Sequence, residues 1–420
     1  MGKGYYCFRA KILNQLSKIK KMTQLPIFKR DITLTIRQRL LEKPKSIQVI
    51  LGPRQVGKTT AILQLLAEWE AAHHYAAADL PAPPEAAWII EQWSIARSHC
   101  DKKNRSVLVL DEVQKVQRWS EVVKKLWDED RAEGRNLHVV ILGSSSLAIQ
   151  KGLTESLAGR FELLRFPHWQ FAECESCFGW TLDQYIFFGG YPGAASYLPD
   201  ENRWAGYVKD SLIESAISKD ILLLHPVEKP ALLRKLFILA CEYGGQILSY
   251  NKMLGQLTDA GNTVTLAAYK RLLEAAFLIA GLEKFSGSKV KTKSSSPKWL
   301  PLNNALITSL RGLSFERARE DSQSWGRLVE CAVGAHLFAG AADKGVELFY
   351  WREGNYEVDY VLRKGSDVTA IEVKSGLRKI HASGLESFAR QYPCRKILIG
   401  GHGGIPIGEA LKIKIEDFFK

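Results

Sequence analysis

A glycine-rich segment between an apolar run and a helical pattern constrains the fold most strongly. The segment GPRQVGKT fits the spacing GxxxxGK[ST], follows the apolar run IQVIL and opens the helical pattern KTTAILQLLAEW. In this setting the backbone wraps phosphate groups, and its N–H groups and the helix N-terminus face their negative charge. The sequence therefore predicts a P-loop that binds ATP and Mg²⁺. The expected ATP-binding residues are Gly52, Pro53, Arg54, Gln55, Val56, Gly57, Lys58, Thr59 and Thr60.

Polar residues that suit ATP hydrolysis follow two later apolar runs. We expect Lys58 to reach the β and γ oxygens and Thr59 to ligate Mg²⁺. The run SVLVLD leads into Asp111 and Glu112, at the edge of a parallel sheet that faces a nucleotide. Asp111 is expected to hold the magnesium shell and Glu112 to orient the attacking water. A helix cap is the alternative for this pair.

The run HVVILG, residues 138–143, ends beside Ser144. If this strand lies between the P-loop strand and the Asp111 strand, the Ser144 hydroxyl is placed to sense the γ-phosphate. An ordinary serine turn is the alternative.

Hydrophobic periodicity predicts an α/β chain with three structural regions. Alternating apolar runs and helical patterns indicate a parallel sheet flanked by helices, with strands at 47–51, 73–79, 106–111 and 138–143. A helical region follows, and its three helices before a lysine-rich segment suit a winged helix with 284–298 as its wing. Helical hairpins give a similar pattern and stay open as the alternative. The last region reads as a helix from Trp325, strands at 346–353, 356–364 and 368–376, a helix, and a strand at 396–400.

Four residues of this last region have the spacing of a nuclease centre. Asp359 is followed by Glu372 thirteen residues later, Lys374 lies two further on, and Glu330 lies on the preceding helix. The pattern resembles the PD-(D/E)XK nuclease core, although Val358 stands where a proline usually precedes the acid. The resemblance implies that Asp359 and Glu372 hold Mg²⁺ and that Lys374 orients water. A β-hairpin with a solvated face, or a domain that binds DNA without cutting it, are the alternatives.

Several motifs also occur in the order seen in one protein family: GPRQVGKTT, LDEVQKVQRW, GSSS, SLAGRF and GGYPG. The chain resembles a prokaryotic AAA+ ATPase family whose C-terminal half is a domain of unknown function. The resemblance implies that Arg160 is an arginine finger that completes a neighbouring subunit's site, and hence a homo-oligomer such as a hexameric ring. A structural salt bridge is the alternative for Arg160. The expected division is a basic extension (1–25), an AAA+ domain (26–180), a helical and winged-helix-like region (181–300) and a nuclease-like domain (301–420).

Charge and composition limit the partners. The net charge is +13, and residues 1–46 hold twelve Lys or Arg against two acidic residues. The stretch 284–298 has five lysines and no acid. Such clusters attract phosphate backbones. For residues 1–46, a solvated flexible tail is an equally good interpretation. No apolar run is long enough to cross a membrane, and seven scattered cysteines, with one CxxC at Cys174 and Cys177, suit a reducing compartment. We therefore expect a cytoplasmic protein without a membrane partner. Met22 is an alternative start.

Two functions from different classes follow. The first is an ATP-driven machine on duplex or branched DNA, of the motor, translocase, helicase or branch-migration type, whose nuclease-like domain contacts DNA. Mg²⁺-dependent DNA cleavage by that domain is open as an additional activity. The second is a regulatory ATPase switch that binds a protein partner and has a non-catalytic C-terminal domain.

Overall fold

The chain folds into two compact units. The computed structural model describes residues 28–79, 81–143, 146–223, 225–257, 261–286, 295–376 and 383–420. Unit 1 comprises Met1–Leu51, Gly57–Gly143 and Ile149–Phe166, and unit 2 comprises Gly52–Val56, Ser144–Ala148 and Pro167–Lys420. The basic stretch 1–27 lies outside the described residues.

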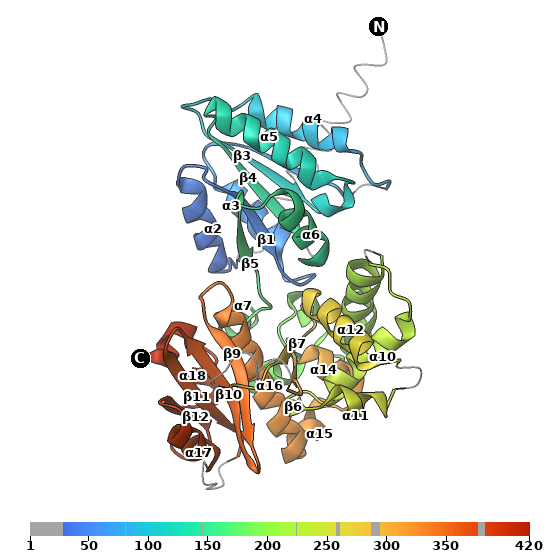
Figure 1. The fold of residues 1–420 in the computed structure, drawn as a ribbon, viewed down its shortest axis with the longest axis vertical. Coiled ribbons are helices and arrows are strands. Elements are labelled where there is room, and N and C mark those ends of the chain that lie inside the picture. Colours follow the sequence, from blue (N-terminus) through green and yellow to red (C-terminus); the bar gives the residue numbers. More distant parts are fainter. Residues whose placement is uncertain are drawn as a thin grey trace. The chain divides into compact units, whose positions relative to one another are not determined.

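Unit 1 is built on a parallel sheet (Figure 1). Its strands are β1 (Ile47–Leu51), β2 (Ala72–Ala77), β3 (Ser106–Asp111), β4 (Leu137–Gly143) and β5 (Phe161–Arg165). They lie in the order β2-β3-β4-β1-β5, and every neighbouring pair is parallel. All residues of β1, β3 and β4 are buried, as is typical of strands covered on both faces. The expected parallel sheet is confirmed, and β4 lies between β1 and β3 as expected.

Helix α2 (Ile32–Leu41) precedes β1. The helices that connect the strands are α3 (Lys58–Ala67), α4 (Ala86–Arg97), α5 (Trp119–Glu133) and α6 (Ser146–Ser156), with the 3₁₀ turn η1 at Val113–Lys115. In Figure 1, α4 lies against β2 and β3, and α5 lies beside α4.

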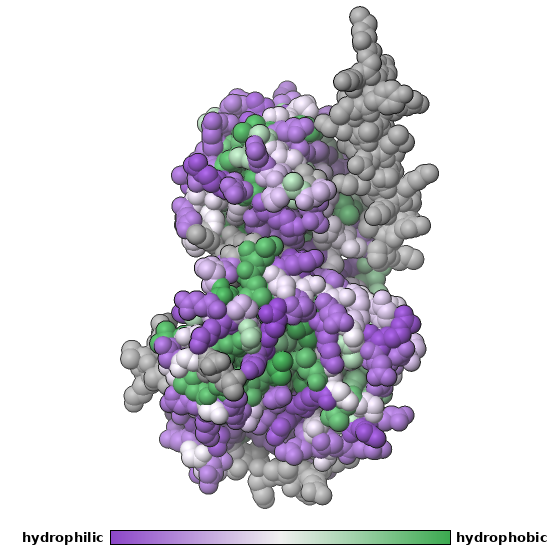
Figure 2. Space-filling view, turned by 90° about the vertical axis from the view of Figure 1, so that its right-hand side faces the viewer, coloured by the Kyte–Doolittle hydropathy of each residue, from purple (hydrophilic) through white to green (hydrophobic). Residues whose placement is uncertain are grey.

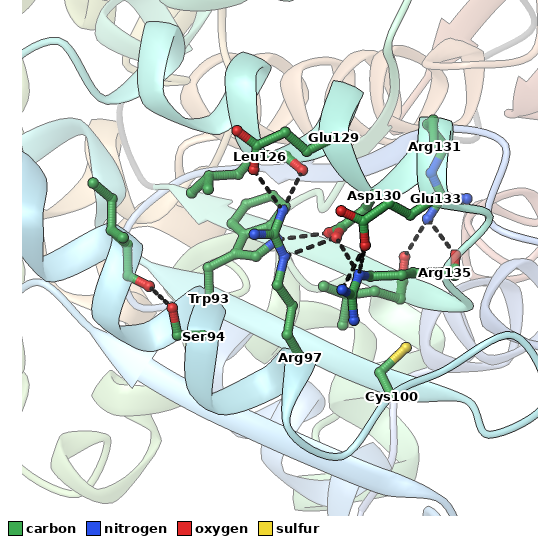
Figure 3. Close-up of polar contacts among 12 residues, drawn as sticks. Trp93, Ser94, Arg97, Cys100, Leu126, Glu129, Asp130, Arg131, Glu133 and Arg135 are labelled. Carbon is green, nitrogen blue, oxygen red and sulfur yellow. Dashed lines mark hydrogen bonds and ion pairs between the residues drawn. The ribbon is translucent and has the colours of Figure 1, made fainter.

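A buried aspartate joins α4 to α5 (Figure 3). Asp130 on α5 has a fully buried side chain and accepts hydrogen bonds from Trp93 Nε1 at 2.7 Å and from Arg97 Nε at 2.8 Å. Arg97 also donates to the backbone oxygen of Leu126 at 2.9 Å and to Glu129 at 3.1 Å. Because a buried charge is tolerated only when it is paired, Asp130 fixes the packing of these two helices.

The first part of unit 2 is helical. It contains α7 (Phe171–Phe178), α8 (Leu182–Phe188), η2 (Pro192–Tyr197), α9 (Glu201–Tyr207) and two π-helical turns, η3 (Val208–Ile213) and η4 (Ala216–Leu222). The motif GGYPG follows α8. A Cβ atom at its Gly190 would lie 2.2 Å from the backbone oxygen of Trp169, so only glycine fits this close approach.

The next elements of unit 2 have the order of a winged helix. They are α10 (Pro230–Glu242), β6 (Gln246–Ile247), α11 (Tyr250–Leu254), α12 (Thr263–Ala275), β7 (Ile279–Leu282) and β8 (Lys298–Pro301). The strands pair antiparallel in the order β6-β8-β7. The lysine-rich segment therefore joins β7 to β8, which is the position of a wing. This order favours the winged helix over helical hairpins.

The C-terminal part of unit 2 is a mixed sheet with helices. The elements are α14 (Ala305–Arg311), α15 (Phe315–Glu320), α16 (Ser322–Ala341), β9 (Glu347–Glu353), β10 (Tyr356–Lys364), β11 (Asp367–Lys374), α17 (Ser383–Gln391), β12 (Arg395–Gly400), α18 (Ile407–Ala410) and η5 (Ile415–Phe419). The sheet order is β12-β11-β10-β9, with β9, β10 and β11 antiparallel and β12 parallel to β11. From α16 to β12 this is the predicted order of elements, although α16 begins at Ser322 rather than Trp325, and α14, α15, α18 and η5 were not predicted.

The surface of unit 2 carries hydrophobic residues among hydrophilic ones on the face shown in Figure 2. The large apolar side chains that unit 2 exposes include Leu223, Ile238, Val264, Leu313 and Tyr356. In the part of the chain that the structure describes, no helix has the length and apolarity that crossing a membrane requires.

Candidate functional site

The second half of the P-loop opens α3. Gly57 has φ 89°, in the left-handed region, and its backbone oxygen accepts a hydrogen bond from Ala61 at 2.9 Å. Because only glycine adopts this conformation at little cost, Gly57 allows the chain to turn from the loop into the helix at Lys58. The free N–H groups of a helix N-terminus form an anion site. The Lys58 side chain is 8% exposed, and Thr60 follows on the same helix.

The expected magnesium ligands lie in contact with each other. Thr59 Oγ1 donates a hydrogen bond to Asp111 Oδ2 at 2.8 Å, and Tyr75 Oη donates to the same oxygen at 2.8 Å. Burial, followed by the charge of Asp111, raises the pKa of Tyr75, so the phenol stays a donor. A hydroxyl and a carboxylate that meet at the end of β3 fit the oxygen ligands that Mg²⁺ prefers.

Tyr75 is a residue of this site that the sequence pattern did not reveal. It lies on β2, which pairs with β3 and brings Ala77 opposite Asp111. The available signal was a lone tyrosine between His74 and Ala76 in a strand, which by itself indicates only packing.

Glu112 has an unusual backbone conformation. Its φ is 55°, a left-handed value that costs a residue other than glycine about 1–3 kcal/mol and is often found at functional sites. Its Oε2 accepts a hydrogen bond from Gln114 Nε2 at 3.0 Å. Gln114 thus helps to orient the side chain of Glu112, which follows Asp111 in the sequence. Ser144, the expected γ-phosphate sensor, lies outside the described residues.

The first half of the P-loop bonds to the helical part of unit 2. Arg54 forms a double hydrogen bond with Asp220, Nε to Oδ2 and Nη2 to Oδ1, both at 2.7 Å. The Asp220 side chain is 2% exposed. Tyr207 Oη donates to Gln55 Oε1 at 2.6 Å, and Trp169 Nε1 donates to the backbone oxygen of Val56 at 2.9 Å. π-Helical turns, one of which carries Asp220, are rare and frequent at functional sites.

We expect Asp220→Ala to change nucleotide affinity as well as stability. The Asp220 carboxylate neutralises Arg54, so its removal leaves a net positive charge in the P-loop, and Coulomb attraction should tighten ADP binding by up to about tenfold. The thermal midpoint should fall, because Arg54 loses a buried partner. Calorimetric titration with ADP measures the first effect.

Asp210→Ala is the matched control, because it removes an exposed aspartate from the neighbouring π-helical turn. Equal ADP affinities in the two variants would mean that nucleotide does not sense the charge of Arg54.

Arg160 is ion-paired within its own chain. Its Nε and Nη2 donate to Asp128 Oδ1 and Oδ2 at 2.7 and 3.0 Å. The hydrogen bond from Arg160 lowers the pKa of Asp128. The role of Arg160 as an arginine finger stays a prediction.

The four residues of the nuclease-like pattern converge in unit 2. Lys374 Nζ is paired with Glu372, and the backbone N–H of Val373 donates to Asp359 Oδ2 at 2.8 Å. An irregularity in the β9–β10 pairing lies between Val358 and Val361, and such bulges re-aim side chains next to active sites. Burial raises the pKa of Glu330 and of Glu372, and Asp359 adds to both shifts.

A fifth residue, Lys298, lies among these carboxylates. The sequence counts it with the lysine-rich segment that attracts phosphates, and for Lys298 this interpretation is wrong. Its side chain is 1% exposed, and its Nζ lies 2.6 Å from Glu330 Oε1 and 3.6 Å from Asp359 Oδ1. Burial lowers the pKa of Lys298, but the surrounding carboxylates outweigh it and raise the pKa above its usual value.

The CxxC of α7 forms no disulfide within the described residues, where Cys174 and Cys177 are free thiols.

No group of three or more His, Cys, Asp or Glu in the described ranges is arranged to hold a metal ion.

Comparisons with known proteins assign part of the chain. Residues 179–317 match a domain of unknown function (DUF8612), and residues 325–414 match another (DUF4143). The uncharacterized protein MJ1544 of Methanocaldococcus jannaschii is 25% identical over 379 residues, which cover 84% of this chain and 78% of that protein.

Two solved structures share little with this chain. The RuvB Holliday junction branch migration motor of Thermotoga maritima is 16% identical, with a TM-score of 0.28, over 64% of this chain and 89% of that one. A variant of that RuvB is 15% identical, with a TM-score of 0.29, over 60% and 87%. Because both TM-scores are this low, neither similarity indicates a function. Residues 44–175 match the model of an AAA domain, so the chain carries an AAA-type P-loop ATPase domain.

Proposed function

We propose that this protein hydrolyses ATP at its P-loop and uses the cycle to act on DNA. In the proposed reaction Lys58 contacts the β and γ phosphates, and Glu112, oriented by Gln114, positions the attacking water. Thr59 and Asp111 would hold Mg²⁺, which offsets phosphate charge when it is bound. Ser144, the next residue in the sequence after β4, would sense the γ-phosphate. The hydrogen bond from Thr59 to Asp111 supports this assignment.

The observation that carries the DNA proposal is the winged-helix order with a lysine-rich connection between β7 and β8. Even without Lys298, this connection holds Lys284, Lys289, Lys291 and Lys293 against one acidic residue, Glu283. Lysines that neutralise phosphates release counterions, which makes binding strong at low salt and steeply salt-dependent. Duplex and branched DNA both present such phosphates.

The salt dependence of binding tests this proposal. Replacing Lys289, Lys291 and Lys293 with serine should weaken duplex binding and reduce the slope of log affinity against log salt by up to about 2.7, at 0.9 per phosphate contact. Fluorescence anisotropy of the full chain in a salt series measures the slope. The control replaces Lys43, Lys102 and Lys103, three exposed lysines of unit 1. An equal reduction in both variants would mean that only net charge matters, and an unchanged slope would favour a switch that binds a protein partner.

The proposal includes a homo-oligomeric ring in which Arg160 acts on a neighbour's nucleotide. Arg160→Ala should keep nucleotide binding and lose about three orders of magnitude in turnover. Asp128→Ala, which removes the partner of Arg160 in its own chain, should keep most of the turnover. ATPase assays of both variants, with nucleotide binding measured in parallel, make the comparison.

Mixing Arg160→Ala with Lys58→Ala subunits should restore part of the activity. If Arg160→Ala and Asp128→Ala lose the same activity, the ion pair serves structure alone.

DNA cleavage is left out of the proposed function. The position of Lys298 among the carboxylates argues against a metal at that place, so the nuclease-like domain is assigned to DNA contact.

A further inference from the structure

One ammonium group is surrounded by the C-terminal carboxylates. Lys298 Nζ lies 2.6 Å from Glu330 Oε1, 3.3 Å from Glu357 Oε1 and 3.6 Å from Asp359 Oδ1. It also donates to the backbone oxygen of Asp359 at 3.3 Å. Three carboxylates this close together repel one another unless a cation compensates them, and Lys298 supplies that cation.

The fold holds Lys298 in this position from both sides. Lys298 begins β8, where it pairs with Leu282 of β7 and Ile247 of β6. The following residues, Trp299 and Leu300, are buried. Its Nζ lies 5.2 Å from the ring centroid of Tyr360 on β10, within the range of a cation–π contact. Strand pairing and packing therefore both direct the side chain into the cluster.

The remaining oxygens do not fit Mg²⁺. This ion needs near-octahedral oxygen ligands at about 2.0–2.1 Å, whereas Glu330, Glu357 and Asp359 are spread around an ammonium. Asp359 Oδ2 accepts the N–H of Val373, and Glu372 is paired with Lys374. Within the described residues, two carboxylate oxygens of this cluster, Glu330 Oε1 and Glu372 Oε2, are buried without a geometric hydrogen bond. Glu330 Oε1 lies 2.6 Å from Lys298 Nζ, which leaves Glu372 Oε2, and one oxygen does not make a metal site.

We propose that the Lys298 ammonium stands where a PD-(D/E)XK nuclease would hold its divalent cation, so that this domain keeps the charge arrangement without metal and without cutting DNA. The ammonium joins β8 to α16 and β10 through Glu330 and Asp359. The carboxylate cluster then stabilises unit 2, and the domain binds DNA without cutting it. This inference goes beyond the ATPase function and is independent of it.

Metal binding to the nucleotide-free full chain tests the proposal. Lys298→Met keeps the apolar stem and removes the charge. Without metal its thermal midpoint should fall well below that of the wild type, and millimolar Mn²⁺ should raise it again, with Mn²⁺ bound at a site that Lys298→Met/Asp359→Asn lacks. The wild type should bind no more Mn²⁺ than Asp359→Asn. Lys374→Met is the matched control and should gain no Mn²⁺ site, because Lys298 remains.

Three results would overturn the proposal. The first is that the wild type binds Mn²⁺ at a site lost in Asp359→Asn, and the second is that the wild type cuts plasmid DNA with Mn²⁺ while Asp359→Asn does not. The third is a folded Lys298→Met that takes up no Mn²⁺. Should Lys298→Met fail to fold even with Mn²⁺, the comparison of wild type with Asp359→Asn decides alone. None of these readouts involves ATP turnover.

Discussion

Glu112→Gln is expected to bind ATP and Mg²⁺ normally while ATP turnover falls to background, and Lys58→Ala is expected to lose turnover through weakened contact with the phosphates. Glutamine keeps the shape of Glu112 and its contact with Gln114 but cannot polarise water as a carboxylate does. General-base assistance contributes about two to four orders of magnitude in rate. Single-turnover hydrolysis, with ATP binding measured in the same preparation, separates the two effects.

Gln114→Ala provides the graded comparison, because it removes only the group that orients Glu112. It should lower turnover less than Glu112→Gln does. Wild-type turnover in either Glu112→Gln or Lys58→Ala would contradict the assignment of this P-loop as the hydrolysing site.

Asp130→Ala is expected to be the most destabilising single substitution discussed for unit 1. Removing a fully buried carboxylate leaves Trp93 Nε1 and Arg97 Nε without their acceptor. Breaking a buried pair in this way costs about 3–5 kcal/mol. Hydrogen exchange at the amides of α4 and α5 measures the effect, because it reports the free energy of local opening.

Glu129→Gln is the control for Asp130→Ala. Glu129 binds the same Arg97 but is 40% exposed, and a partly exposed pair contributes about 1 kcal/mol at most. Equal loss of protection in both variants would show that burial of Asp130 is not the cause.

The sequence predicted the sheets because their strands are read from local patterns. β1, β3 and β10 were predicted to the residue, since each is an apolar or alternating run with clear ends. β5 was missed because its segment FELLR buries little and alternates with charge. The two-residue β6 is too short for any pattern to reveal, and it was the element needed to distinguish a winged helix from helical hairpins.

Site residues could be predicted from the sequence only where they do not depend on contacts between residues far apart in the chain. The P-loop spacing predicted Lys58 and Thr59, and the end of a strand predicted Asp111, because motif spacing and strand ends are local signals. Asp220 bonds to Arg54 from 166 positions away, and no local pattern marks it. Lys298 could not be predicted for the same reason. A lysine in a lysine-rich stretch is expected to be exposed, and its burial is explained only by the carboxylates that the fold brings around it.

ATP turnover of the wild-type chain, measured with and without DNA, decides whether the ATPase acts on DNA. We expect slow turnover by the protein alone and a clear acceleration by duplex or four-way DNA, which Glu112→Gln abolishes. The acceleration should weaken as salt rises, because phosphate contacts are screened. If turnover is the same without DNA and with single-stranded, duplex or four-way DNA, the protein does not act on DNA. That result would indicate a regulatory ATPase that responds to a protein partner.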